Sequence, residues 1–249
     1  MIILKSKSEL ELMRKSGRIV GQVLLELEKR IRPGVKTRDL DKISYELFIE
    51  NGCVPAFLGY HGYPATICSS INEEVVHGIP GDRVLEEGDI VGIDIGAYYN
   101  GYCGDAARTF PVGKISKSLE RLLTITFQAL NIGIQQCHAG NHISDIGYAI
   151  QSFVEQQGYS VVKDYVGHGI GKAMHEDPQV PNYGEPHVGS EILDGMCLAL
   201  EPMVNEGTDA VKVLEDGWTV ITADGKYSAH FEDTVGIIDG QAENLTRIK

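Results

Sequence analysis

The feature that most constrains this chain is an internal repeat with an offset of 106 or 107 residues. Five landmarks of the first half recur at this nearly constant distance in the second half. The pairs are Gly34 and Gly140, Asp39 and Asp145, Gly52 and Gly158, His61-Gly62 and His168-Gly169, and the segments 88–94 and 195–201. Self-similarity at a fixed offset is typical of a duplicated structural unit. Because no linker rich in Pro, Ser or Gly separates the copies, we predict one domain over residues 1–249, with pseudo-symmetric halves of approximately 1–112 and 113–249.

Hydrophobic periodicity predicts two helices at the start of each half. Apolar residues recur at helical spacing from Leu10 to Ile31, after a capping-box pattern at Ser8 and Glu11. A second helix is expected from Thr37 to residues 51–52, with counterparts of the pair over 118–138 and 143–157. The strand candidates are 66–71, 90–95, 101–110, 196–200, 218–222 and 230–238. The chain is therefore predicted to be α/β (α+β), with two helix–helix–sheet halves around one core.

Composition excludes several classes of protein. The 249 residues are 43% hydrophobic with a net charge of -13, and they contain no apolar run long enough to span a membrane and no apolar start typical of a signal peptide. The cysteines are scattered, odd in number and without a CxxC pair, which argues against a disulfide framework and against a thiolate zinc site. They are Cys53, Cys68, Cys103, Cys137 and Cys197. We therefore predict a reduced, cytoplasmic protein.

The charge is unevenly distributed along the chain. Residues 1–42 hold 11 basic and 6 acidic residues, whereas residues 43–249 hold 11 basic and 29 acidic ones. The basic start is interpreted either as a solvated helix face or as a patch that docks on an acidic partner such as ribosomal RNA. The acidic remainder argues against DNA and anionic membranes as partners.

Acidic residues inside apolar strands are the first chemical anomaly. Asp94, Glu201 and Glu232 each interrupt an otherwise buried segment, and Asp105 follows Tyr102-Cys-Gly in another. A buried carboxylate is costly unless it meets a cation, a set of donors or a proton. One such residue is usually structural, but four are better explained by shared divalent metal.

Three histidines lie in contexts that could complete a metal centre. His168 is flanked by glycines in Val166–Gly171, His175 follows seven residues later, and His77 lies in Glu74–Pro80. Four carboxylates and one imidazole suit a pair of first-row divalent ions. Two such ions would lower the pKa of a shared water molecule and generate hydroxide near neutral pH. The constellation therefore indicates hydrolysis.

These motifs closely resemble those of the type I methionine aminopeptidases over essentially the whole chain. The matching stretches are Tyr60–Pro64, Ser70–Pro80, Gly88–Gly96, Gly167–Gly171, His175–Gln179, Leu200–Met203 and Asp216–Thr219. The resemblance implies the pita-bread fold, in which pseudo-symmetric halves surround a central antiparallel sheet. It also implies a hydrolase, an exopeptidase that removes the initiator methionine from nascent proteins when the second residue is small, by means of water activated by two metal ions.

The resemblance assigns roles to individual positions of this chain. The implied metal ligands are Asp94, Asp105, His168, Glu201 and Glu232, of which Asp105 and Glu232 bridge both ions. Glu201 is also implied as the proton shuttle, and His77 and His175 as catalytic histidines that contact the scissile amide. The implied substrate-binding residues are Phe57, Tyr60, His61, Tyr63, Cys68, His77, His175 and Trp218. The metals could be Co, Mn, Fe or Zn, and a monomer is the family expectation.

Four positions depart from the usual bacterial pattern of the family. Cys103 and Asp233 stand where histidines are common, Phe57 where a small cysteine is frequent, and Met174 where an aromatic residue is usual. None of these departures removes a ligand. Asp233 is expected to add negative charge beside the metals, and Phe57 and Met174 could reshape the specificity pocket.

Two alternatives were weighed against this interpretation. An Xaa-Pro peptidase would use the same metal centre, but the chain length and the contexts of Tyr60, Tyr63 and Trp218 count against it. A non-catalytic member of the fold that binds peptides or histones would be expected to lose ligands, and this sequence keeps all five.

Overall fold

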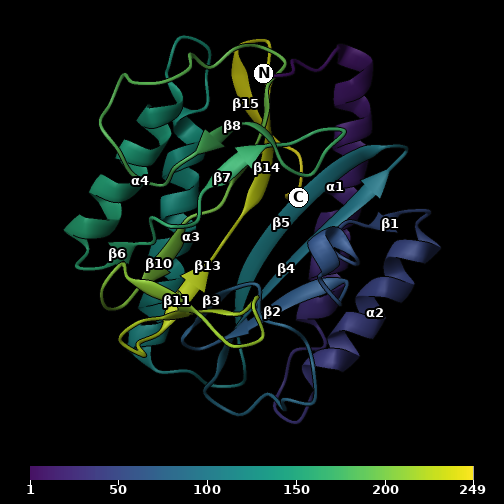
Figure 1. Ribbon diagram of the computed structural model, residues 1–249, viewed down its shortest axis with the longest axis vertical. Coiled ribbons are helices and arrows are strands. Elements are labelled where there is room, and N and C mark those ends of the chain that lie inside the picture. Colours follow the sequence, from purple (N-terminus) through teal and green to yellow (C-terminus); the bar gives the residue numbers. More distant parts are fainter. Residues whose placement is uncertain (249) are drawn as a thin grey trace.

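The computed structural model describes residues 1–248. Two pairs of helices lie on the two sides of a central layer of strands (Figure 1). The first pair is α1 (Lys7–Glu28) and α2 (Thr37–Glu50), and the second is α3 (Lys117–Gln136) and α4 (Ile143–Gln156). All four predicted helices are confirmed, with ends that differ from expectation by at most two residues except at the end of α1, which stops at Glu28, three residues before the predicted Ile31. No helix of the described residues is long and apolar enough to cross a membrane.

The start of α1 corrects one prediction. The helix is capped by Ser6 and Glu9, not by Ser8 and Glu11: the Ser6 side chain accepts a hydrogen bond from the Glu9 backbone N–H, and the Glu9 carboxylate accepts one from the Ser6 N–H at 2.8 Å. The sequence contains two overlapping capping-box patterns, and the helix uses the first one.

The strands form four sheets. In the largest sheet of the first half, β4 (Ile90–Tyr99) pairs with β1 (Val54–Pro55), β2 (Ile67–Ile71) and β5 (Tyr102–Pro111). The largest sheet of the second half has five strands in the order β15 (Gln241–Asn244), β14 (Asp233–Ile238), β9 (Cys197–Leu200), β7 (Gly167–Gly169) and β8 (Glu176–Val180). Two three-stranded sheets are β13 (Ser228–His230) with β10 (Met203–Asn205) and β6 (Ser160–Val161), and β11 (Val211–Val213) with β12 (Val220–Thr222) and β3 (Glu74–Val76). Every strand pair is antiparallel.

The strands β5 and β14 meet along a seam with reciprocal contacts. The Thr109 hydroxyl bonds the backbone of His230 at 2.8 and 2.9 Å, and the Thr234 hydroxyl bonds the backbone of Asp105 at 2.8 and 3.0 Å. Between them, Ala107 and Glu232 exchange two backbone hydrogen bonds. Thr109 and Thr234 thus make equivalent contacts and lie 125 positions apart, and so do Asp105 and His230. Such reciprocal contacts are expected for two related halves.

Two details of the predicted repeat are wrong. His61 lies in the 3₁₀ turn η1 (Tyr60–Gly62) whereas His168 lies in strand β7, so this pair does not occupy matching elements. The repeat of segments 88–94 and 195–201 also predicts that Asp94 and Glu201 lie at matching strand ends, but β4 continues five residues beyond Asp94 whereas β9 stops directly before Glu201.

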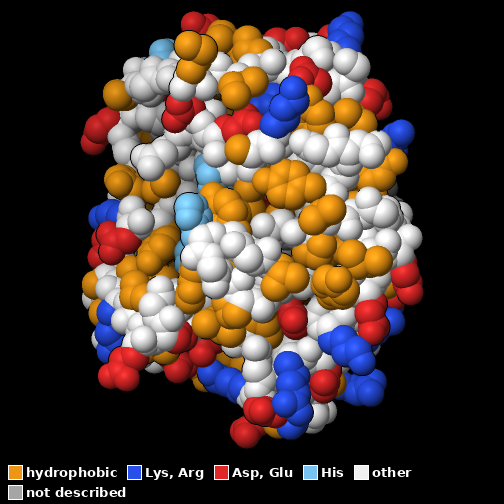
Figure 2. Space-filling model, turned by 45° about the vertical axis from the view of Figure 1, so that its right-hand side comes forward, with side chains coloured by type: hydrophobic (Ala, Val, Ile, Leu, Met, Phe, Trp, Pro, Cys, Tyr) orange, Lys and Arg blue, Asp and Glu red, His pale blue; other side chains and the backbone are white. Residues whose placement is uncertain are grey.

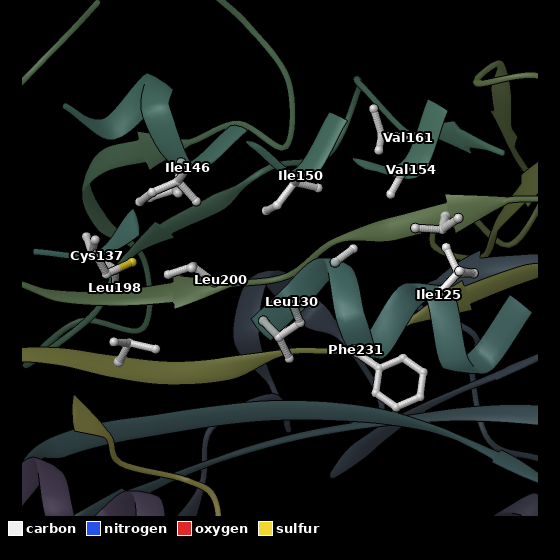
Figure 3. Packing of buried hydrophobic residues seen from close by; sticks show 14 of the residues in the cluster. Ile125, Leu130, Cys137, Ile146, Ile150, Val154, Val161, Leu198, Leu200 and Phe231 are labelled. Carbon is white, nitrogen blue, oxygen red and sulfur yellow. The ribbon is translucent and has the colours of Figure 1, made fainter. Parts of the chain in front are cut away.

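The hydrophobic core fixes the residues that precede two of the acids. Figure 3 shows Ile146 and Ile150 of α4 in one buried cluster with Leu198 and Leu200 of β9, and Phe231 belongs to the same cluster. Because Leu200 and Phe231 are anchored in the core, the backbone positions of the acids that follow them are fixed as well.

Candidate active site

A pocket of about 270 Å³ lies where the sheets of the two halves meet. Its walls are acidic on one side and apolar or aromatic on the other. The lining residues are Phe57, Tyr60, Tyr63, Cys68, Val76, His77, Asp94, Asp105, Tyr165, Val166, His168, Met174, His175, Glu201, Trp218 and Glu232. In the surface view of Figure 2, histidine side chains lie together beside hydrophobic ones near the middle of this face.

Strand register brings three of the carboxylates together. Asp94 on β4 pairs with Ala107 on β5, and Ala107 is bonded in turn to Glu232 on the far side. Asp105 lies two positions from Ala107 on the same strand, so its side chain lies on the same face. Ala107 is fully buried, and its small side chain leaves room between the acids.

The fourth acid and the imidazole come from the other half. His168 on β7 lies opposite Ala199 on β9, and Glu201 directly follows that strand. Three potential ligand atoms lie within 4.8 Å of one another, one each from Asp105, His168 and Glu232. In addition, His168 Nε2 is 3.7 Å from Glu201 Oε1. Asp94, Asp105, His168, Glu201 and Glu232 therefore form a single cluster, which we call the acidic cluster.

Several oxygens of the acidic cluster lack protein partners. Oδ1 of Asp94, Oδ1 of Asp105 and Oε1 of Glu232 are buried and have no hydrogen-bond donor among the described residues. Buried acceptors of this kind are rarely left unsatisfied. A donor set of carboxylate oxygens and one imidazole fits first-row divalent cations. The residues present therefore fit a metal centre.

The electrostatics of the acidic cluster support the same assignment. Burial raises the pKa of Asp94 to about 7. Burial and then repulsion by the neighbouring carboxylates raise the pKa values of Asp105, Glu201 and Glu232 far above their ordinary range. The four groups cannot all be ionised at neutral pH unless positive charge enters the cluster.

The tautomer of His168 is set by its neighbour. Its Nδ1 lies 2.9 Å from the Gly169 carbonyl oxygen, which can only accept, so Nδ1 carries the proton and the Nε2 lone pair is free. Burial lowers the pKa of His168 to about 4. The imidazole is therefore neutral at pH 7 and suited to bind a metal through Nε2.

Two further histidines lie beside the acidic cluster. His175 Nδ1 is 2.7 Å from the Tyr60 hydroxyl, and its ring lies 4.2 Å from that of His168. His77 lies across the pocket, in edge contact with Tyr165 and Trp218, and its φ of 61° is rare for a residue other than glycine. Burial lowers the pKa of His77 to about 4, and burial also lowers the pKa of His175. Both rings are therefore neutral hydrogen-bonding groups at pH 7.

The comparisons with known proteins agree with this geometry. A model described as metallopeptidase family M24 matches residues 11–239. The chain is 51% identical to methionine aminopeptidase of Clostridium perfringens over 249 residues, the full length of both, and 51% identical over 248 residues to methionine aminopeptidase 1 of Bacillus subtilis, again covering both. The chain belongs to the methionine aminopeptidases of metallopeptidase family M24. The resemblance found in the sequence is confirmed.

Solved structures agree in fold with this family assignment. Methionine aminopeptidase from Thermotoga maritima matches with a TM-score of 0.98 and 46% identity over the whole of both chains. The prolidase from Pyrococcus furiosus matches with a TM-score of 0.78 and 25% identity, covering 99% of this chain and 66% of that one. The predicted pita-bread fold is therefore confirmed.

The structure of this M24 family member brings together all but one of the residues singled out from the sequence. His61 does not line the pocket: its side chain is exposed, and its ring contacts the edge of Tyr60 at 4.4 Å. In the 3₁₀ turn, Tyr60 lies in the pocket wall, and the next residue points elsewhere.

Sequence reasoning missed several residues of the site. Val76, Tyr165 and Val166 line the pocket. Val76 and Val166 lie close to His77 and His168 in segments that were recognised, but an apolar residue near a histidine carries no signal of its own. His230 is buried behind the pocket, with Nε2 3.8 Å from Glu201 Oε2 and no hydrogen-bond partner. It precedes Glu232 by two positions, which is the spacing of one strand face, so alternation was the one signal that could have found it.

The structure changes the expectation that Asp233 adds negative charge beside the metals. Asp233 is fully buried, and its oxygens lie 2.5 Å from Arg108 and 2.5 Å from Arg247. Burial would raise the pKa of Asp233, but these two guanidinium groups lower it below its ordinary value. The extra negative charge expected beside the metals is therefore balanced within the chain.

Proposed function

We propose that this chain is a metal-dependent methionyl aminopeptidase that removes the N-terminal methionine of nascent proteins when the second residue is small. The observation that carries this proposal is the junction, in one pocket, of the acidic cluster with an apolar recess. The cluster suits hydrolysis, and the recess suits one unbranched apolar side chain.

In this proposal, Asp94, Asp105, His168, Glu201 and Glu232 hold two divalent ions drawn from Co, Mn, Fe and Zn. Ions bound there would supply Lewis-acid chemistry, lowering the pKa of water and polarising a carbonyl group. The orphaned oxygens of the acidic cluster and its raised carboxyl pKa values support this assignment.

The chain's own groups would supply orientation and proton transfer. Glu201, whose pKa is raised by burial, is suited to accept a proton from water and pass it to the leaving amine. His77 and His175 are neutral and face the same pocket, so their N–H groups can stabilise the oxygen that gains charge at the scissile carbonyl. The hydroxyl of Tyr60, 2.7 Å from Nδ1, fixes the ring of His175.

Methionine specificity would come from the apolar wall. Tyr63 and Trp218 meet edge to face with ring centroids 5.1 Å apart, and Phe57 and Cys68 are buried beside them. A thioether fits such a surface because sulfur packs well against aromatic edges. A large second residue would be rejected by steric conflict, since each methylene group in a closed pocket is worth about 1–3 kcal/mol.

The partners would be nascent polypeptide N-termini in the cytoplasm, encountered by a monomer. Docking of the basic segment 1–42 on the ribosome belongs to the same proposal, because that segment has a net charge of +5 within an acidic chain. Cosedimentation with ribosomes that weakens as salt rises is the expected result, and absent or salt-insensitive cosedimentation would remove this part.

The decisive experiment measures release of free methionine from peptides that start with Met-Gly, Met-Leu or Ala-Pro. Each is incubated with chelated enzyme and again after Mn, Co, Fe or Zn is added back. Cleavage of the Met-Gly peptide alone, restored by metal, is the expected result. Cleavage of only the Ala-Pro peptide would assign the chain to proline-specific peptidases, and no cleavage with metal shown to be bound would indicate a binding protein.

A further inference from the structure

A second group of metal-binding side chains lies away from the active site. Among residues 1–248, the groups of His142, Asp145 and His187 form one of two clusters in which three ligand atoms lie within 4.8 Å of one another. Two of these residues belong to the start of α4, on the outer side of the molecule (Figure 1), and none lines the active-site pocket.

We propose that His142, Asp145 and His187 bind a Zn²⁺-class divalent cation at a site separate from the catalytic metals. His187 Nδ1 is 3.2 Å from one Asp145 oxygen, and His142 Nδ1 is 3.9 Å from the other. Zinc binds imidazole nitrogen and carboxylate oxygen at about 2.0–2.2 Å, so tetrahedral ligands lie roughly 3.3 Å apart. The shorter of the two spacings is close to this, and all three ligand atoms lie within 4.8 Å of one another, so small side-chain rotations would bring them to one ion with a fourth position left for water.

The Asp145 carboxylate is held in place with spare capacity for a cation. Its side chain is 7% exposed, and its two oxygens accept hydrogen bonds from the backbone N–H groups of His142 and His187, both at 2.7 Å. Each carboxylate oxygen has a second lone pair that these bonds do not use. Burial would raise the pKa of Asp145, but these two hydrogen bonds lower it, so the group is ionised at neutral pH.

His142 supplies an independent indication of a missing ligand. Its Nδ1 atom is buried, faces the backbone N–H of Asp145 in the first turn of α4, and makes no hydrogen bond of normal geometry among the described residues. Unpartnered buried ring nitrogens are rare, because each forgoes the hydrogen bond that it would make in water. The ion pairs of Asp145 within the described chain are with the two imidazoles alone.

The matching corner of the first half carries side chains of a different kind. Lys36 precedes His142 by 106 residues, and each forms an isolated backbone bridge, to Val84 and to Glu191 respectively. In the first half, the Lys36 ammonium and the Arg38 guanidinium each lie 2.8 Å from Asp82. These cations have no lone pair that could bind a metal ion, whereas the imidazoles of the second half do. Only the second half therefore offers metal-binding groups at this corner.

A bound ion would join segments that are distant in the sequence. His187 belongs to the stretch between β8 and β9, and the ion would tie this stretch to the first turn of α4. The position of Asp145 in that first turn also offsets the unfavourable interaction of a cation with the positive end of the helix.

The test compares zinc binding by wild-type protein and three variants. His187→Asn and His142→Asn each remove one ligand; asparagine tolerates the left-handed φ of 60° at residue 187 and is a good helix N-cap at residue 142. The matched control is His138→Asn, a half-buried histidine on the same connection that is outside the cluster. Metal-stripped proteins are dialysed against buffered Zn²⁺, and bound zinc is counted by elemental analysis.

We expect the wild-type protein and His138→Asn to bind one more equivalent of Zn²⁺ than the two cluster variants. The affinity of that equivalent should fall by more than about tenfold in each cluster variant, while methionine release stays unchanged in all four proteins. As a second measurement, Zn²⁺ should slow proteolysis within residues 184–191 in wild-type protein but not in His187→Asn. Identical zinc isotherms in wild-type and His187→Asn would overturn the proposal and leave His187 and Asp145 as a simple ion pair.

Discussion

The substitution Asp94→Asn tests whether the acidic cluster depends on metal for its stability. The pKa of Asp94 is raised by burial to about 7 in the metal-free protein, against 3.8 for the free side chain. Because the folded state holds this proton more tightly than the unfolded chain, the folded state loses stability as the pH rises from 3.8 to 7. Asparagine has nearly the same shape as aspartic acid but does not ionise, so the stability of the variant does not fall over this pH range for that reason.

The size of the effect follows from the same values. Each pKa unit between the folded and unfolded states corresponds to about 1.4 kcal/mol of folding free energy, so a difference of roughly 3 units corresponds to about 4 kcal/mol at most. The protons on the other carboxylates redistribute once Asp94 is neutral, so we expect the metal-free variant to be about 2–4 kcal/mol more stable than wild type at pH 8. For a chain of this size, that is a rise in Tm of roughly 5–15 °C.

The assay is urea and thermal unfolding of chelator-treated wild-type and Asp94→Asn protein at pH 4 and pH 8. The two should be nearly equal at pH 4 and should separate at pH 8, with the variant more stable. Added Mn²⁺ should reverse the order at pH 8, since only a protein that binds the ion tightly is stabilised by it. A metal-free variant that is no more stable than wild type at pH 8 would refute the reasoning.

Three further results are expected. His175→Ala should lower kcat about 10²–10³-fold with metal content unchanged, and Tyr60→Phe should lower it less; metal loss in the histidine variant would make His175 a ligand. Asp233→Asn removes the buried counter-charge of the half-buried Arg108 and Arg247 and should cost about 3 kcal/mol in urea unfolding, whereas a cost below about 1 kcal/mol would contradict the argument from this ion-pair network. Gly104→Ala would place a methyl carbon 2.8 Å from a backbone nitrogen of α1, so its Tm should fall, and an unchanged Tm would show that the helix can shift.

Local patterns were sufficient for the helices but not for the short strands. Helix ends were predicted to within three residues because capping and glycine signals act locally. Strands such as β3, β7 and β10 have three residues each, too few for alternation to be visible. The segment 230–238 was predicted as one strand, yet it is divided into β13 and β14 around Glu232, because the first part pairs with β10 and the second with β9.

The capping error has a tertiary cause. Patterns at Ser6–Glu9 and Ser8–Glu11 are equally good locally, and the choice depends on what holds the preceding residues. Lys5 bonds Gly195 through its backbone and Glu176 through its buried ammonium group, at 2.7 Å in both cases. The chain is thus fixed directly before Ser6, and the helix begins there.

The candidate site was predictable to different depths. The acidic cluster could be inferred from carboxylates inside apolar segments, because burial of charge has few physical explanations. His77 and His175 could be singled out from their sequence contexts, but their proposed catalytic role and the aromatic wall came from the resemblance. His230 was missed because a buried histidine beside a strand is ordinarily structural, and only its distance from Glu201 sets it apart.

Glu232 and Asp233 show what separates a buried acid that the chain balances from one that it does not. They are adjacent, and both are buried, yet the pKa of Glu232 is raised whereas that of Asp233 is lowered. Asp233 lies 125 residues after Arg108 and meets it across the seam, so its counter-charge is part of the chain. Glu232 lies 125 residues after Ala107, which offers no charge and no donor beyond its backbone. The seam therefore balances one acid and leaves its neighbour without a counter-charge from the chain, as a residue that is proposed to bind a metal ion requires.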